Sequence, residues 1–192
     1  MHRRPLNDLF DRYAAFWPDE APLVARFRAF VAAHTDCLVR TCLVGHITAS
    51  AWIEDDVGAR CLLLHHKKLG RWLQLGGHVD GEPHVEHAAL REAQEESGMR
   101  AFGFVHWGAA LVPLDLDVHP IPARRDEPAH EHWDVRFWLR AAPGQDLVRP
   151  DEANDLRWVT VGELPQLTTE ASVLRLPQKA ALLARRSTLR IC

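Results

Sequence analysis

The feature that most constrains this chain is a run of acidic residues placed just after a glycine-rich stretch. "LGGHVDGEPHVEH" (75–87) is followed closely by "LREAQEESGM" (90–99). At about 100° per residue, Glu92, Glu95 and Glu96 occupy one arc of roughly 100° on a helix. Like charges at this spacing repel each other, so the pattern predicts a positive partner. Clustered carboxylates are ligands that Mg²⁺ or Mn²⁺ prefers.

The neighbouring residues predict how this helix is bounded and what surrounds it. Pro83 favours a first helical turn and Gly98 a helix end, so we expect a helix from Pro83 to the residue before Gly98. Arg91 lies on the edge of the acidic arc, where its guanidinium can orient a carboxylate. Gly76 and Gly77 let the backbone approach a bound group, and their carbonyls can ligate a metal.

Composition narrows the class of protein. The 192 residues suit one domain with an appendage, and 47% hydrophobic with 26% charged residues argue against disorder. A net charge of −3 gives no broad attraction for nucleic acid or acidic lipid. No apolar run reaches the ~20 residues of a membrane span, and the four cysteines lack C-x-x-C spacing. We expect a cytoplasmic protein that binds no nucleic acid polymer and no membrane.

Periodicity indicates helices first and mixed structure afterwards. Apolar residues recur at three-to-four spacing over residues 4–34, which predicts helices. Later segments read as strands, separated by a predicted glycine-rich loop (71–81) and a long charged link (119–132). A final helix is predicted over 169–186. Strands mixed with flanking helices indicate an α/β layered domain.

The spacing around the glutamates resembles the Nudix box, G-x5-E-x7-R-E-U-x-E-E-x-G-U, where U is a bulky apolar residue. The matching residues are Gly77, Arg91, Glu92, Glu95, Glu96, Gly98 and Met99. One position departs, because Pro83 stands where the pattern has its first glutamate. Glu82 or Glu86 replaces that glutamate through a shifted turn, or Arg91 leans on another group.

The resemblance extends over about residues 45–165 and implies a fold. It is a Nudix-type α/β/α sandwich around a mixed β-sheet, with an N-terminal helical extension. We therefore expect residues 1–36 to form the extension and residues 37–192 the Nudix hydrolase domain. The extension is predicted to act as a cap or as a contact in a homodimer.

The function implied is Mg²⁺-dependent hydrolysis of the diphosphate bond of a nucleoside diphosphate linked to another moiety, a small-molecule substrate. By resemblance, Glu92, Glu95 and Glu96, with the Gly76 carbonyl, hold Mg²⁺ or Mn²⁺, and Arg91 fixes a carboxylate. The candidates for the general base are Glu95, Glu127, His130 and Glu131. Two alternatives stay open: a Nudix-fold module that senses a nucleotide without turnover, and a zinc hydrolase built on histidines.

Further residues are candidates for contact with the substrate. They are Gly77, His78, Lys67, Lys68, Trp72, Arg125, His130 and Glu131, with Arg124 beside them. Each has a structural interpretation as well, since exposed turn lysines and packed tryptophans are common. For the zinc alternative, "HVEH" (84–87) and "HEHW" (130–133) each supply two histidines, and a third ligand is not evident.

Overall fold

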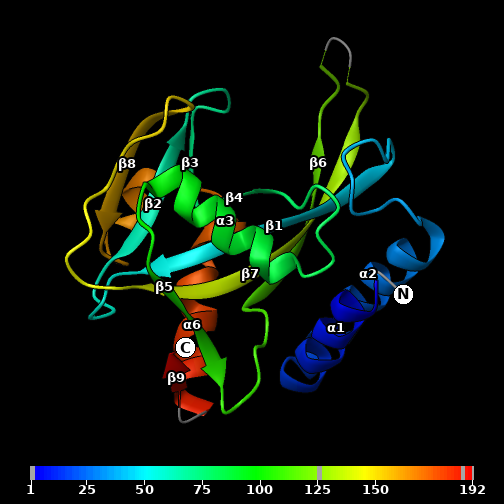
Figure 1. The fold of residues 1–192 in the computed structure, drawn as a ribbon, viewed down its shortest axis with the longest axis horizontal. Helices are drawn as coiled ribbons and strands as arrows, with labels where there is room; N and C mark the ends of the chain where they lie inside the picture. Colours follow the sequence, from blue (N-terminus) through cyan, green and yellow to red (C-terminus); the bar gives the residue numbers. More distant parts are fainter. Residues whose placement is uncertain (1–2, 125–126, 187–188, 192) are drawn as a thin grey trace.

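The fold was obtained as a computed structural model, which describes residues 3–124, 127–186 and the backbone of 189–191 (Figure 1). The helices are α1 (Arg4–Phe16), the 3₁₀ turn η1 (Pro18–Glu20), α2 (Ala21–Ala33), α3 (Val85–Ser97), α4 (Leu164–Leu167), α5 (Ala171–Leu174) and α6 (Leu176–Arg186). The strands are β1 (Gly45–Glu54), β2 (Cys61–His66), β3 (Arg71–Leu73), β4 (Leu75–His78), β5 (Phe102–Trp107), β6 (Asp115–Ile121), β7 (His130–Ala141), β8 (Ala153–Val159) and β9 (Leu189–Ile191).

The strands form a mixed sheet around a parallel pair. β1 and β7 run parallel over ten residue pairs, from Gly45 with Glu131 to Glu54 with Arg140. The main order is β3-β2-β1-β7-β5-β9; β4 also pairs with β1, β6 with β7, and β8 with β2. Nine of the ten residues of β1 are buried, so both faces of the sheet are covered there.

Helices cover the two faces of this sheet. α3 lies across one face, and α6 lies behind the sheet in Figure 1. Ala93 of α3 and Met99, just beyond the end of α3, share a buried cluster with Ala51 and Ile53 of β1 and Leu75 of β4. The prediction of an α/β/α sandwich around a mixed sheet is therefore confirmed.

The predicted N-terminal helices are also present. α1 and α2 pack side by side next to β6 and β7 (Figure 1). The ring of Phe30 stacks on Trp133 of β7 at 4.4 Å between centroids, and the Tyr13 hydroxyl accepts the N–H of Leu116 at 3.2 Å. The two helices thus belong to the same core cluster as the sheet. The division at residue 36 and the homodimer contact stay predictions.

Several local expectations were wrong. The stretch 71–81, which its glycines predicted as a loop although the Nudix resemblance implied strands up to residue 78, contains β3 and β4, because its backbone pairs with β2 and β1. Much of the link 119–132 belongs to the β6–β7 hairpin. The final helix is divided at Arg175 into α5 and α6. α3 begins at Val85 rather than Pro83, and it ends before Gly98, whose φ of 73° is left-handed.

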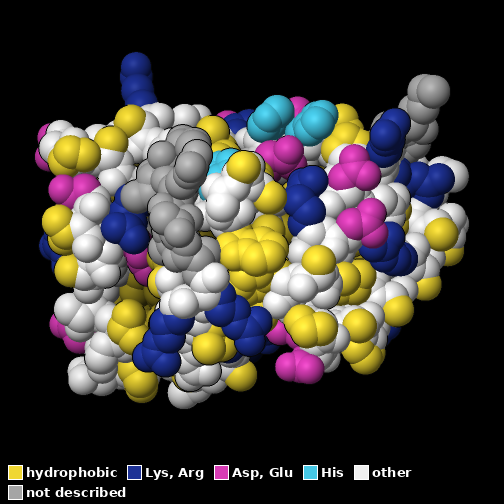
Figure 2. Space-filling view, turned by 90° about the horizontal axis from the view of Figure 1, so that it is seen from below, with side chains coloured by type: hydrophobic (Ala, Val, Ile, Leu, Met, Phe, Trp, Pro, Cys, Tyr) yellow, Lys and Arg dark blue, Asp and Glu magenta, His cyan; other side chains and the backbone are white. Residues whose placement is uncertain are grey.

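The face of the molecule drawn in Figure 2 carries side chains of both charges. Figure 2 shows the molecule from below, with an apolar area in the middle and Lys and Arg side chains interspersed with Asp and Glu. In the described part of the chain, every helix is too short or too polar to cross a bilayer.

Candidate active site

Strand β4 and helix α3 bring the glycines and the glutamates together. Gly76 pairs with Ser50 and Gly77 with Ala49 in the antiparallel β4–β1 ladder. From α3, the carboxylate of Glu96 accepts the N–H of Gly76 at 2.8 Å. The acidic arc predicted from the sequence therefore faces the glycine-bearing strand.

Both glycines are required by close approach. Gly76 has a φ of 156°, and a Cβ there would lie 2.3 Å from the Cβ of Ser50. A Cβ on Gly77 would lie 2.7 Å from the carboxylate carbon of Glu92. Either substitution forces the strand or the carboxylate to move, so the glycines create the space in which the carboxylates sit.

Arg91 holds the carboxylates in place. Its Nη1 lies 2.8 Å from a carboxylate oxygen of Glu92 and 3.1 Å from one of Glu95. Its Nη2 donates to the carbonyl of His78 at 2.8 Å, which links α3 to β4. Arg91 thus contacts carboxylates of its own helix and the backbone of β4. Glu82, which precedes Pro83, accepts the N–H of His84 at 2.8 Å at the start of α3.

The site carries more negative charge than Arg91 neutralises. Burial raises the pKa of Glu96 to about 8, with the carboxylates of Glu92 and Glu152 adding to the rise and the Gly76 N–H opposing it. Burial also raises the pKa of Glu92, although Arg91 opposes the rise. Hard oxygen donors crowded in this way, beside a glycine strand, fit a divalent cation such as Mg²⁺.

Comparison with known proteins identifies this arrangement. A family model described as the NUDIX domain matches residues 45–187. The chain belongs to the Nudix hydrolase family. The comparison with curated proteins gives no match.

Solved structures of several hydrolases share the fold of this Nudix chain. A NUDIX-family hydrolase from Clostridium perfringens is 22% identical, with a TM-score of 0.55, covering 74% of this chain and 98% of that one. An Ap4A hydrolase from C. elegans, in a binary complex, is 19% identical, with a TM-score of 0.57 and coverage of 72% and 98%. A MutT NUDIX hydrolase from Burkholderia pseudomallei is 29% identical, with a TM-score of 0.51 and coverage of 70% and 97%.

Among the described residues, three of the predicted substrate contacts make no hydrogen bond or ion pair with the Nudix carboxylates. Lys67 and Lys68 are exposed in the turn between β2 and β3. Trp72, in β3, is half-buried; its ring lies 5.0 Å from that of His65, and Arg157 lies over it at 4.7 Å. Arg125 lies outside the described residues. The substrate roles of these side chains stay predictions.

The remaining predicted residues gather at one end of the sheet. His78 ends β4, and His130 and Glu131 begin β7, next to the first residues of β1. Here His78 and His130 meet other histidines, among them His46 and His132. Burial, followed by the charge of neighbouring imidazoles, lowers the pKa of His46 to about 4 and that of His132 to about 2. These rings are therefore neutral at physiological pH.

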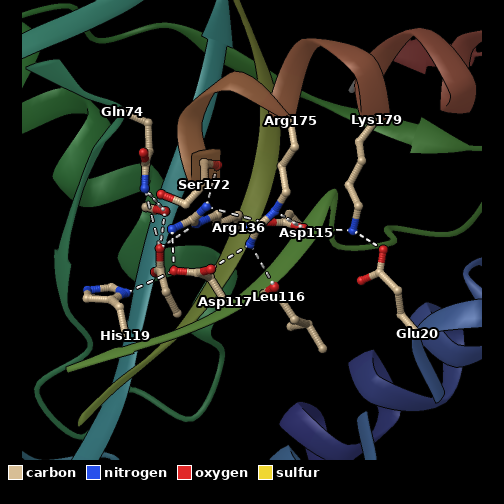
Figure 3. Close-up of polar contacts among 12 residues, drawn as sticks. Glu20, Gln74, Asp115, Leu116, Asp117, His119, Arg136, Ser172, Arg175 and Lys179 are labelled. Atoms are coloured by element: carbon tan, nitrogen blue, oxygen red, sulfur yellow. Dashed lines mark hydrogen bonds and ion pairs between the residues drawn. The ribbon is translucent and has the colours of Figure 1, made fainter. Parts of the chain in front are cut away.

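A buried polar network, which sequence reasoning did not predict, lies on the other face of the sheet (Figure 3). Arg136 is at its centre, with nitrogen atoms 2.8 Å from Asp134, 3.2 Å from Asp115 and 2.9 Å from Asp117. Arg175, between α5 and α6, contacts Asp115 at 2.8 Å, and Lys179 of α6 contacts the same carboxylate at 2.7 Å. The network holds α6 to the sheet.

The same network reaches β4, the strand that contains Gly76 and Gly77, through Gln74. The Gln74 amide donates to the Ser50 hydroxyl at 3.2 Å, and that hydroxyl donates to Asp134 at 2.7 Å. Ser50 is the residue against which Gly76 packs. Through Gln74, the residue before β4, the network is therefore linked to the strand that carries the two glycines.

Proposed function

We propose that this Nudix hydrolase is Mg²⁺-dependent and cleaves the diphosphate bond of a nucleoside diphosphate linked to another moiety. The observation that carries the proposal is the convergence of Glu92 and Glu96 on Gly77 and Gly76, with Arg91 clamping the helix to β4. Cytoplasmic localisation is proposed with it.

The residues have distinct roles in this proposal. Glu92, Glu95 and Glu96, with the Gly76 carbonyl, would hold the cation; Mn²⁺ would serve in place of Mg²⁺. When bound, the cation would neutralise phosphate oxygens and lower the pKa of an attacking water. Arg91 orients the carboxylates of Glu92 and Glu95 before any substrate arrives, so less reorganisation is needed during the reaction.

The general base is proposed among the residues that keep a free path to solvent. Glu95 is more exposed than Glu92 and Glu96, with 59% of its side chain accessible to solvent. Glu127 is also exposed, and its carboxylate lies 3.8 Å from His130 Nε2. Glu131 follows His130 at the start of β7. We favour Glu95, because it is on the helix that carries the other carboxylates.

The test is a panel of nucleoside diphosphate derivatives incubated with the full chain and Mg²⁺. We expect release of a mononucleotide from at least one of them, and a loss of at least about a hundredfold in turnover in Glu96→Gln. Glu86→Gln is the matched control, since Glu86 lies on the same helix but contacts His84 rather than Arg91. Tight nucleotide binding without turnover would instead support a sensing module.

A zinc hydrolase built on "HVEH" has less support. The rings of His84 and His87 stack at 5.2 Å, and Nδ1 of His84 lies 3.2 Å from a carboxylate oxygen of Glu86, so this pair offers two imidazoles of which one nitrogen is already engaged. Zinc that supports turnover and is lost on His87→Gln would favour this alternative over the carboxylate site.

A further inference from the structure

Five histidines from four strands meet at the end of the sheet where β1 and β7 begin. The ring of His46 lies 4.9 Å from His78, 5.0 Å from His130 and 4.8 Å from His132, between centroids. His119 of β6 lies 5.5 Å from His132. Such a group cannot be an accident of a single strand's periodicity, because its members are distant in sequence.

His46 is buried without satisfying its ring. Only 1% of the residue is exposed, and neither ring nitrogen makes a hydrogen bond. The nearby carbonyl of Cys42 acts to raise the pKa of His46, but it does not form a hydrogen bond with either ring nitrogen. A buried polar group left unpaired costs about 1–3 kcal/mol, so its presence asks for a ligand.

The hydrogen bonds of His130 define which of its nitrogens is free. Nδ1 lies 2.9 Å from the carbonyl of Pro128, which can only accept, so Nδ1 carries the proton. The Nε2 atom therefore keeps its lone pair, and it faces Nε2 of His132 at 3.4 Å. In metal sites, a ligating histidine commonly donates its other N–H to a backbone carbonyl in this way.

We propose that His46, His130 and His132 form a binding site for a divalent transition-metal ion of the zinc class. One nitrogen from each lies within 4.8 Å of the other two. Tetrahedral zinc with Zn–N bonds of about 2.0–2.1 Å separates its ligand atoms by roughly 3.3 Å, so small ring rotations complete the site. His78 or a water supplies the fourth ligand.

This site differs in chemistry from the carboxylate site on α3. Its ligands are neutral imidazoles, which suit Zn²⁺ and related ions, whereas Mg²⁺ prefers oxygen. A shallow hollow of about 400 Å³, lined by Val44, Ile121 and His130 among others, gives access from the surface. The bound ion joins the first residues of β1 and β7. It thereby secures the end of the β6–β7 hairpin that adjoins its connecting loop, where Ile121 pairs with His130, and the site does not depend on the proposed hydrolase activity.

The test is titration of Zn²⁺ into the chelator-treated full chain, in competition with a chromophoric chelator, followed by Co²⁺ as a spectroscopic probe. We expect one equivalent of Zn²⁺, a rise in Tm, and a Co²⁺ spectrum typical of tetrahedral nitrogen coordination. His132→Gln should weaken Zn²⁺ binding at least about tenfold, since even the loss of an outer partner costs 10–100-fold.

A second variant separates loss of the site from loss of the fold. His46→Leu removes the unpaired ring, so without metal its Tm should equal or exceed that of the wild type, while the Zn²⁺-induced rise disappears. His87→Gln and Glu96→Gln are the controls and should keep the full Zn²⁺ response. The proposal is overturned if the wild type binds no stoichiometric Zn²⁺. It is equally overturned if His46→Leu and His132→Gln bind as the wild type does, or if either control abolishes binding.

Discussion

Replacing Arg136 by methionine tests how strongly the buried network holds the two layers together. The Arg136 side chain is 2% exposed and contacts three carboxylates, those of Asp115, Asp117 and Asp134. Methionine fills similar space without charge. In the variant, Arg175 still contacts Asp115 and Asp117 and Lys179 still contacts Asp115, but Asp134 loses its guanidinium partner.

The expected cost follows from burial. Breaking a buried ion pair from one side typically costs about 3–5 kcal/mol, because the remaining charge stays uncompensated. For a chain of this size, 1 kcal/mol corresponds to about 2–4 °C, so Tm should fall by roughly 6–20 °C. The matched control is Arg28→Met, whose pair with Asp11 at 2.5 Å has side chains 38% and 69% exposed. There we expect about 1 kcal/mol or less.

Urea unfolding followed by tryptophan fluorescence measures the free energy of unfolding of both variants. Thermal scans check that their Tm values fall in the same order. The dependence on pH adds a second readout. Burial would raise the pKa of Asp117, but the hydrogen bond with His119 and the charges of Arg136 and Arg175 lower it overall. In the wild type this carboxylate therefore contributes stability above the unfolded pKa, which is lost only as pH falls through the lower folded value.

In Arg136→Met, Asp117 loses that partner, so its pKa rises and the folded state takes up a proton more readily. The deficit relative to the wild type should narrow between pH 8 and pH 5. A cost no larger than that of Arg28→Met, or a deficit that widens towards acid pH, would refute the reasoning.

Three further outcomes are expected. Gly77→Ala should reduce turnover at least about tenfold, because its Cβ meets the Glu92 carboxylate, whereas Gly70→Ala, with nothing within 4 Å, should retain turnover despite a local strain of about 1 kcal/mol; kinetic assays compare the two. Since burial raises the pKa of Glu96 to about 8, the metal-free protein should lose stability as pH rises from about 5 to 9, and Glu96→Gln should flatten that dependence in thermal scans. Deleting residues 1–36 should give an unfolded or aggregating chain by circular dichroism, because α1 and α2 share the sheet's core; a folded, active monomer would contradict this.

The Nudix helix could be predicted because its signals are local. The positions of Glu92, Glu95 and Glu96 on one arc follow from 3.6 residues per turn, and Gly98 ends the helix through its own backbone preference. Arg91 could be assigned to orient a carboxylate for the same reason. Its third contact, the carbonyl of His78, depends on where β4 lies and could not be read from helix geometry.

The parts that sequence reasoning missed depend on pairing between distant segments. Leu75 to His78 contain two glycines and carry little strand preference; they form β4 because β1 offers a ladder. The histidines of β1 and β7 look like isolated strand residues until the parallel register sets His46 beside His132. Only the spacing of His130 and His132, two apart on a strand, indicated that side chains there share a face.

The parallel pairing of β1 with β7 also has a consequence for the order in which the chain can fold. Thr48 and Asp134, hydrogen-bonded across this pair, are 86 residues apart. During synthesis the centre of the sheet therefore stays open until β7 has left the ribosome. Contacts of such high sequence separation form slowly, since loop closure must precede them. The nascent chain should accordingly expose its apolar strands for longer than a hairpin-built protein would, and its yield should depend on chaperones that shield them.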